Sequence, residues 1–188
     1  MFPSCVWVEN LNFNTDKLKS NLDEFKKQGL KVKLSNRNGD QYDDYRNKDL
    51  SDVILRSFPK VHGKPELKDP SVYMWVNRNP KGASNSRHTH IAFTGKPLFL
   101  SGVYYVKVPE NSGRIRFYDP RMISSINPPD YEYYHESSQY HFIIPHEDMI
   151  IFFPSWFEHD VEENKSNEER ISIGFNIFGV VPNSERSY

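Results

Sequence analysis

Hydrophobic and polar positions follow two different periods along this chain. In the amino-terminal third, apolar residues recur at helical spacing between Asn14 or Thr15, either of which can cap a helix, and Gly29, which can end one. A second short helix is predicted through residues 50–54. It is expected to end before Pro59, because proline lacks the N–H that a helix interior requires. The two helices are expected to support a sheet from outside.

From residue 72 onward the period changes to two, which is typical of strands. Both alternating sets of residues 98–108 are apolar, so this strand is expected to be buried on both faces. Many short strands joined by polar loops favour a mainly β fold with flanking helices (α+β), built on the double-stranded β-helix, or jelly-roll, core of the cupins. The predicted strands are 72–77, 98–108, 114–118, 149–153 and 171–178.

One stretch, residues 119–148, is rich in proline and tyrosine and shows no clear period. A long irregular loop within a compact domain is usually a lid or binding loop, and otherwise a disordered insertion. We favour the lid. The chain is therefore expected to form a single domain over 1–188, with helical support over 1–70 and a jelly-roll core over 71–180 that carries this insertion.

Composition narrows the class of protein. With 24 Lys and Arg against 25 Asp and Glu in 188 residues, the chain is close to neutral and has no long basic run, so nucleic acid is not expected as an obligate partner. Cys5 is the only cysteine, which excludes an internal disulfide and favours a reducing compartment. No apolar run is long enough for a membrane span, and the first residues do not resemble a signal peptide. A cytoplasmic location is expected.

Three histidines are the candidate metal ligands. His88 and His90 stand one residue apart, and alternation along a strand places both on the same face, where they can bind one ion. A His-x-His pair alone can equally be two solvated side chains. Here, however, the pair follows a Pro-Gly loop and precedes a buried strand, and His159 ends a different apolar strand. That order of parts favours a shared metal site.

The segment His146-Glu147-Asp148 offers a competing His-x-Asp pair, the commoner ligand set of non-haem iron enzymes. It opens the strand that leads to His159, and five or six extended residues already span roughly 17–20 Å. We therefore interpret it as a polar turn. Glu158 and Asp160 alternate away from His159, so neither is expected to supply a carboxylate ligand.

Arg170 opens the last apolar strand and is the candidate anion-binding residue. Its planar guanidinium suits bidentate capture of a carboxylate, and Ser172, on the same face, can add a hydroxyl donor. The alternative is an ordinary charged residue at the start of a strand, paired with Glu168 or Glu169.

Taken in order, these segments resemble the iron(II)- and 2-oxoglutarate-dependent oxygenases, most closely a group of uncharacterised oxygenases of phages and bacteria, with the prolyl hydroxylases as more distant relatives. The resemblance is carried by residues 88–90 in the slot of the His-x-Asp pair, the strand 100–106, the turn and strand 112–117, the strand and histidine 149–161, and the Arg-x-Ser of 170–172.

The resemblance implies Fe(II) held by His88, His90 and His159, with 2-oxoglutarate and O2 as cosubstrates. It assigns the outer carboxylate of 2-oxoglutarate to Arg170 and Ser172. Tyr105 matches a tyrosine that contacts the keto acid in prolyl hydroxylases, and Asn77, on the strand before the histidine pair, is a further candidate beside the cofactor. The chain departs from the prolyl hydroxylases at His90, where they have aspartate. A third neutral imidazole leaves the iron with a higher net charge.

The implied reaction is hydroxylation of a C–H bond, with release of succinate and CO2. Two alternatives remain open. One is a three-histidine cupin dioxygenase or isomerase that does not use 2-oxoglutarate, and the other is a jelly-roll binding module without catalysis. The primary substrate is not fixed by the sequence. A peptide or protein side chain is favoured, and a nucleoside or a sugar remains open. For a phage protein the compartment is the host cytoplasm.

Overall fold

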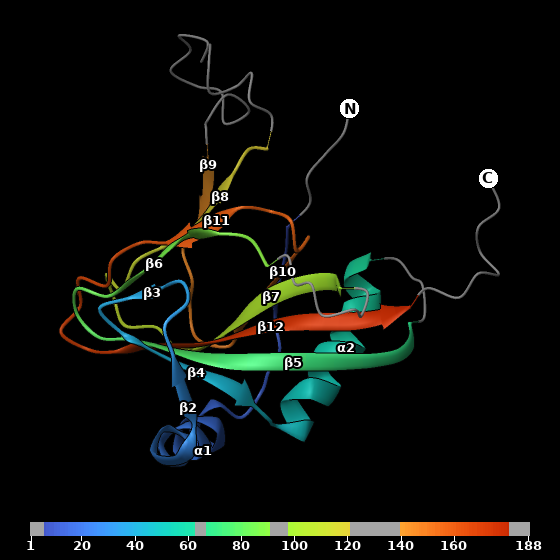
Figure 1. Ribbon diagram of the computed structural model, residues 1–188, viewed down its shortest axis with the longest axis horizontal. Helices are drawn as coiled ribbons and strands as arrows, with labels where there is room; N and C mark the ends of the chain where they lie inside the picture. The colour runs from blue at the N-terminus through green and yellow to red at the C-terminus, as the bar shows by residue number, and fades with distance from the viewer. Residues whose placement is uncertain (1–5, 63–66, 91–97, 121–139, 181–188) are drawn as a thin grey trace, which may run out of the picture.

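The computed structural model describes residues 6–62, 67–90, 98–120 and 140–180, which form three layers (Figure 1). A small sheet lies on one side of a large sheet, and two helices lie on the other side. In chain order the elements are β1 (Trp7–Asn10), α1 (Thr15–Gln28), β2 (Leu30–Val32), β3 (Asn36–Arg37), β4 (Asp40–Tyr45), α2 (Lys48–His62), β5 (Lys68–Asn79), β6 (Ser84–His88), β7 (Leu98–Lys107), β8 (Ile115–Tyr118), β9 (Tyr140–Ile143), β10 (Met149–Phe153), β11 (His159–Val161) and β12 (Arg170–Val180).

The large sheet has the strand order β1-β10-β7-β12-β5-β4-β2, and the small sheet has the order β3-β6-β11-β8-β9. Neighbouring strands pair antiparallel in both sheets. Most neighbours in space are not neighbours in sequence, because the chain crosses repeatedly from one sheet to the other. Two facing antiparallel sheets connected in this way form the jelly-roll core predicted from the sequence.

Two apolar clusters hold the three layers together. One lies between the helices and the large sheet and contains Leu18 and Leu22 of α1 and Leu50 and Ile54 of α2. The other lies between the two sheets. Strands β7 and β10 contribute alternate side chains to both clusters, so they are apolar on both faces, as predicted for residues 98–108.

The helices confirm most of the sequence prediction. Asn14 caps α1 by accepting a hydrogen bond from the Lys17 N–H, and the Gly29 N–H donates to the Phe25 carbonyl at the other end. The predicted end of α2 before Pro59 is wrong, because α2 continues to its last residue, His62. Proline deletes one backbone hydrogen bond of a helix. That loss is outweighed here by the burial of the apolar face of α2 against the large sheet.

Several strands were not predicted. β1 to β4 add four strands to a region for which only helices were expected. β9 lies within the stretch expected to be irregular, and its side chains are mostly exposed, so it lacks the alternation that marks a half-buried strand. The remainder of the expected lid, 121–139, lies outside the described residues. Within the part of the chain that the structure describes, no helix is long and apolar enough to cross a membrane.

Candidate metal centre

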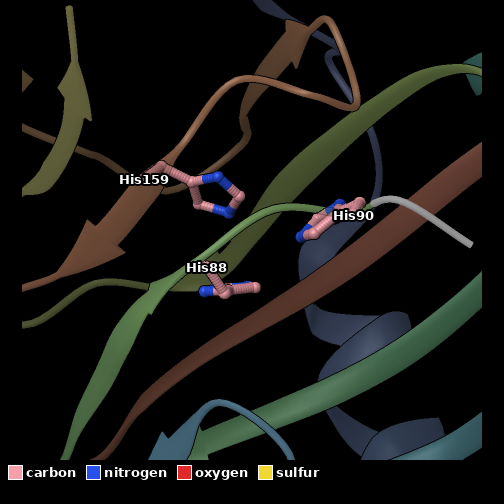
Figure 2. Close-up of side chains that lie close together, drawn as sticks. All are labelled: His88, His90 and His159. Atoms are coloured by element: carbon pink, nitrogen blue, oxygen red, sulfur yellow. The ribbon is translucent and has the colours of Figure 1, made fainter. Parts of the chain in front are cut away.

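The three candidate histidines meet between the two sheets (Figure 2). One nitrogen from each of His88, His90 and His159 lies within 4.8 Å of the corresponding nitrogens of the other two. Their ring centroids are 4.4 Å apart for His88 and His159, 4.8 Å for His90 and His159, and 5.2 Å for His88 and His90. Among the described residues, this is the one group of three or more His, Cys, Asp or Glu side chains close enough to share a metal ion.

The small sheet determines this convergence. His88 ends β6 and His159 begins β11, and the two residues are direct partners in the antiparallel pair of these strands. His90 lies just beyond β6, where its backbone N–H donates to the Ser155 carbonyl at 2.9 Å. A local bond therefore fixes His90 next to a pair whose positions are set by strand register.

Burial keeps the three imidazoles neutral. Desolvation lowers the pKa of His159 to about 3, lowers the pKa of His90 well below its ordinary value, and lowers the pKa of His88. A neutral imidazole has one nitrogen lone pair available for a metal. The Nδ1 atoms of His88 and His159 lie 2.7 Å from the Ser86 carbonyl and 3.0 Å from the Phe157 carbonyl, which leaves Nε2 of each as the ligand atom.

Both carboxylates beside His159 are engaged elsewhere. Glu158 forms an ion pair with Arg87. Asp160 binds Arg116 at 2.6 Å and accepts a hydrogen bond from the Tyr118 hydroxyl at 2.7 Å. Both carboxylates therefore contact other side chains rather than the three histidines.

The competing segment 146–148 is a turn, as predicted. His146 is exposed. Asp148, which has a positive φ of 67°, accepts hydrogen bonds from the backbone of Asn12 and Phe13 and from the Tyr104 hydroxyl. Its carboxylate thus attaches the segment that precedes α1 to the large sheet.

A small cavity lies beside the three histidines between the sheets, and Arg170, Ser172, Tyr105 and Asn77 all line it. The structure thus brings all seven residues predicted from the sequence to one cavity. Strand register explains the grouping, since Ser172 is the direct partner of Tyr105 on one side and of Asn77 on the other. Arg170 precedes Ser172 by two residues and therefore lies on the same face of β12.

Arg170 is a buried cation that has no carboxylate partner among the residues that the structure describes. Arg170 is only 1% exposed, and its guanidinium donates hydrogen bonds to the carbonyls of Ser112 and Gly113. Within the described ranges it pairs with neither Glu168 nor Glu169, which bind Lys107 and Arg78 instead, so the strand-start ion pair considered from the sequence is wrong. Burial lowers the pKa of Arg170, and this direction records the cost of desolvating the charge.

Two other cavity residues, Tyr105 and Asn77, also present polar groups. The Tyr105 hydroxyl is buried and has no hydrogen-bond partner in the described part of the chain, and burial raises its pKa, so it remains a neutral donor. Asn77 is held by Asn85, whose Nδ2 lies 3.5 Å from the Asn77 Oδ1. Unpaired buried polar groups are costly and rare. A guanidinium, a phenol and a serine hydroxyl around one cavity fit a bound carboxylate, and the histidines fit a metal ion.

Sequence reasoning missed three residues of this site. Gly174 lets the Trp75 ring lie against the backbone of β12, because a Cβ at position 174 would lie 2.4 Å from that ring. Trp75 then walls the cavity 5.1 Å from the His90 ring. Asn176 lines the adjoining groove together with His90. The period-two pattern that places Arg170 and Ser172 on one face also places Gly174 and Asn176 there, and it could have identified both.

Comparison with known proteins agrees with this arrangement. The family described as "Putative 2OG-Fe(II) oxygenase" matches residues 73–176, more than half of the chain. No curated protein sequence matches the chain.

Several solved structures share the fold. A prolyl-4-hydroxylase from Pseudomonas putida superimposes with a TM-score of 0.62 at 14% identity, covering 95% of this chain and 94% of its own. HygX from Streptomyces hygroscopicus, solved with nickel, 2-oxoglutarate and hygromycin B, gives 0.64 at 10% identity, covering 94% and 83%. A Trichoplax adhaerens prolyl hydroxylase, in complex with a peptide fragment of the hypoxia inducible factor oxygen degradation domain, gives 0.63 at 15% identity, covering 93% and 83%.

At these identities the neighbours establish the fold, whereas the family match covers the segment that carries all seven of these cavity residues. Fe(II) and 2-oxoglutarate are the metal and cosubstrate of that family, and the residues of the cavity suit both. The chain belongs to the 2OG-Fe(II) oxygenase family and is an oxidoreductase that depends on 2-oxoglutarate and Fe(II).

Proposed function

We propose that His88, His90 and His159 hold the Fe(II), that Arg170 binds the outer carboxylate of 2-oxoglutarate, and that the enzyme hydroxylates a C–H bond of a separate substrate with release of succinate and CO2. The observation that supports this most directly is the unpaired, buried guanidinium of Arg170 in the same cavity as three converging imidazoles. A buried charge of this kind is costly unless a counter-ion binds it.

The spacing along β12 suits a small diacid. Arg170 and Gly174 are four residues apart, which corresponds to about 13 Å along a strand. An extended arginine side chain covers part of this length, and we place the diacid along the rest, with its keto acid end toward the histidines.

In this arrangement the protein supplies binding, orientation and exclusion of water, and the bound Fe(II) supplies the oxidising chemistry. Arg170 offers a bidentate pair of donors, while Ser172 and the neutral Tyr105 hydroxyl add single hydrogen bonds. Trp75 and Phe153 pack around the His90 ring and shield it from solvent. The neutral imidazoles need no deprotonation before they bind the metal.

The primary substrate is proposed to enter through an open groove that adjoins the histidines and is lined by residues 33–35, β4 and β5. Tyr73 and Trp75 provide aromatic surface along it, and His88 and His90 lie at its inner end. We favour a peptide or protein side chain as substrate, since an open groove admits an extended chain and the Trichoplax neighbour holds a peptide. HygX, which holds hygromycin B, is the reason to test small polar molecules as well.

Anaerobic titration with Fe(II) and 2-oxoglutarate tests the proposal. We expect the visible metal-to-ligand charge-transfer band that accompanies chelation of iron by a keto acid. We expect His159→Ala to abolish this band and His146→Ala, which removes an exposed histidine, to leave it unchanged.

A wild-type protein that binds Fe(II) without ever forming the band would favour the three-histidine dioxygenase that does not use 2-oxoglutarate. A wild-type protein that binds no metal would refute both assignments of the site.

A further inference from the structure

The groove proposed for the primary substrate contains a carboxylate that lacks a cationic partner among the described residues. Asp43 of β4 lines this groove, at whose inner end His88 and His90 lie. The Tyr73 hydroxyl donates a hydrogen bond to one carboxylate oxygen of Asp43 and so holds the carboxylate in place. Asp43 forms no ion pair with any residue that the structure describes. Lys33 also lines the groove, but its side chain is exposed and lies beyond ion-pair distance of Asp43.

A second hydrogen-bond acceptor belongs to the same wall of the groove. Gln41 precedes Asp43 by two residues on β4, so the two side chains lie on one face of the strand, and both line the groove. Gln41 is only 3% exposed, and its Oε1 atom has no hydrogen-bond partner among the described residues. A buried acceptor without a partner is costly. A ligand N–H that reaches this wall would therefore be stabilised.

Two aromatic rings lie beside these acceptors. Tyr73 and Trp75 are two residues apart on β5, and their ring centroids are separated by 6.1 Å. Trp75 also lines the metal cavity, and its ring lies 5.1 Å from the ring of His90. Burial raises the pKa of Tyr73 to about 12, so its hydroxyl keeps its proton and remains a donor to Asp43. Aromatic surface therefore connects the histidines with Asp43, and aromatic faces attract cations.

The charge of this wall favours a cation as the ligand. The Asp43 carboxylate and the Gln41 Oε1 atom are acceptors, so they suit the N–H donors of an ammonium or guanidinium group and disfavour a carboxylate or a phosphate. The metal site does not reverse this preference, because the two carboxylates of bound 2-oxoglutarate offset the two positive charges of Fe(II).

We propose that the primary substrate carries an ammonium or guanidinium group that pairs with Asp43. The cation lies against the Tyr73 and Trp75 rings, and Gln41 accepts one of its N–H groups. The inference rests on the proposed function, because it names the substrate class of the same site. A basic side chain of a peptide and a free amine both supply this chemistry.

Binding of blocked amino acids to the full chain tests the proposal. The protein is loaded with 2-oxoglutarate and with Co(II) in place of Fe(II), without oxygen, so that no turnover occurs. We expect N-acetyl-lysine methylamide to bind at least about tenfold more tightly than its norleucine analogue, which has the same carbon chain but no charge. The glutamate analogue should bind less tightly than either. Faster NMR relaxation of the bound lysine protons, caused by the paramagnetic Co(II), would place the probe beside the metal.

Two further probes distinguish the sources of the cation. The arginine analogue replaces the ammonium with a guanidinium, and n-butylamine is an amine without a peptide backbone. Tighter binding of the blocked amino acids than of n-butylamine would support a peptide substrate. Equal binding would support a small amine, and both results agree with a cationic substrate.

Two neighbouring carboxylates on β4 provide a matched pair of variants. Asp43→Asn keeps the shape of the side chain and an acceptor for Tyr73. It should weaken binding of the lysine probe by at least about tenfold and leave binding of the norleucine probe unchanged. Asp44→Asn is the control, because Asp44 is exposed, pairs with Arg46 and does not line the groove. Asparagine also tolerates the positive φ of 51° at this position. Binding of the lysine probe should be unchanged in this variant.

The outcomes separate this inference from the proposed function. If the wild type binds neither Co(II) nor 2-oxoglutarate, the site itself is wrong and both fall. If it binds both, but no cationic probe binds at millimolar concentration, this inference alone falls. Norleucine binding as tight as lysine binding would also overturn it. Equal losses in Asp43→Asn and Asp44→Asn would overturn the role of Asp43.

Discussion

Replacing Arg170 with methionine should have opposite consequences for cosubstrate binding and for the stability of the free protein. The guanidinium is buried and contacts two backbone carbonyls but no carboxylate within the described part of the chain. Methionine keeps most of the volume and removes the charge. The substitution therefore removes a partner that 2-oxoglutarate needs, but not one that any described acidic residue needs.

Loss of one member of a buried ion pair costs roughly 3–5 kcal/mol, so 2-oxoglutarate should bind Arg170→Met at least about 100-fold more weakly. At a cosubstrate concentration 100 times the wild-type Kd, binding stabilises the wild type by about 2.7 kcal/mol. For a domain of this size that corresponds to a rise in melting temperature of roughly 5–11 °C. At the same concentration the variant gains only about 0.4 kcal/mol, or roughly 1–2 °C.

In the free protein the terms oppose each other. Removing an uncompensated buried charge is favourable, while the Ser112 and Gly113 carbonyls lose a donor at a cost of about 1–3 kcal/mol. The melting temperature of the free variant should therefore stay within about 5 °C of the wild type or exceed it.

Arg78→Met is the matched control. Arg78 is also buried, at 7% exposure, but it binds Glu169 at 2.6 Å and Asp23 at 2.8 Å. Its loss should destabilise the free protein by about 1–3 kcal/mol, since both carboxylates are partly exposed and are rehydrated, while the 2-oxoglutarate shift persists.

The assay is thermal unfolding under anaerobic Fe(II), with and without 2-oxoglutarate. A full ligand-induced shift in Arg170→Met would refute the assignment of this residue to the cosubstrate.

Two further predictions address the turn before β10 and the histidines. Asp148→Ala should lower the free energy of unfolding, measured with urea, by about 3 kcal/mol, because Asn12, Phe13 and Tyr104 lose a charged acceptor. The same substitution should leave the Co(II) affinity, measured by titration, unchanged. Weaker Co(II) binding would instead favour His146 and Asp148 as metal ligands. The metal-free protein should lose stability as the pH falls from about 6.5 toward 3, since the pKa of His159 is about 3 when folded and the unfolded chain takes up the proton first. Each histidine with a lowered pKa changes the free energy of unfolding by up to about 1.4 kcal/mol per pH unit. His159→Asn should therefore reduce the dependence of the urea-measured free energy of unfolding on pH. The same pH dependence in the variant and the wild type would contradict the reasoning.

The extent of agreement between sequence and structure follows from the range of the interactions involved. α1 was predicted correctly from its cap at Asn14 to its end at Gly29, because capping and helical periodicity are local. β7, β10 and β12 were predicted because their residues are buried along most of their length. β9 and the strands before residue 48 were missed, because short or exposed strands are stabilised by a neighbour rather than by their own sequence.

The sequence by itself determined the chemistry available to this protein: three histidines, an arginine and a hydroxyl-bearing strand in the order of an oxygenase. Only the tertiary structure decided what these groups do together. The register of β6 against β11 makes His88 and His159 partners, and the packing of the last strand buries Arg170 against backbone carbonyls rather than against any described carboxylate. The sequence gives the type of each side chain. Which side chains pair and which are buried depends on which distant strands come to lie side by side.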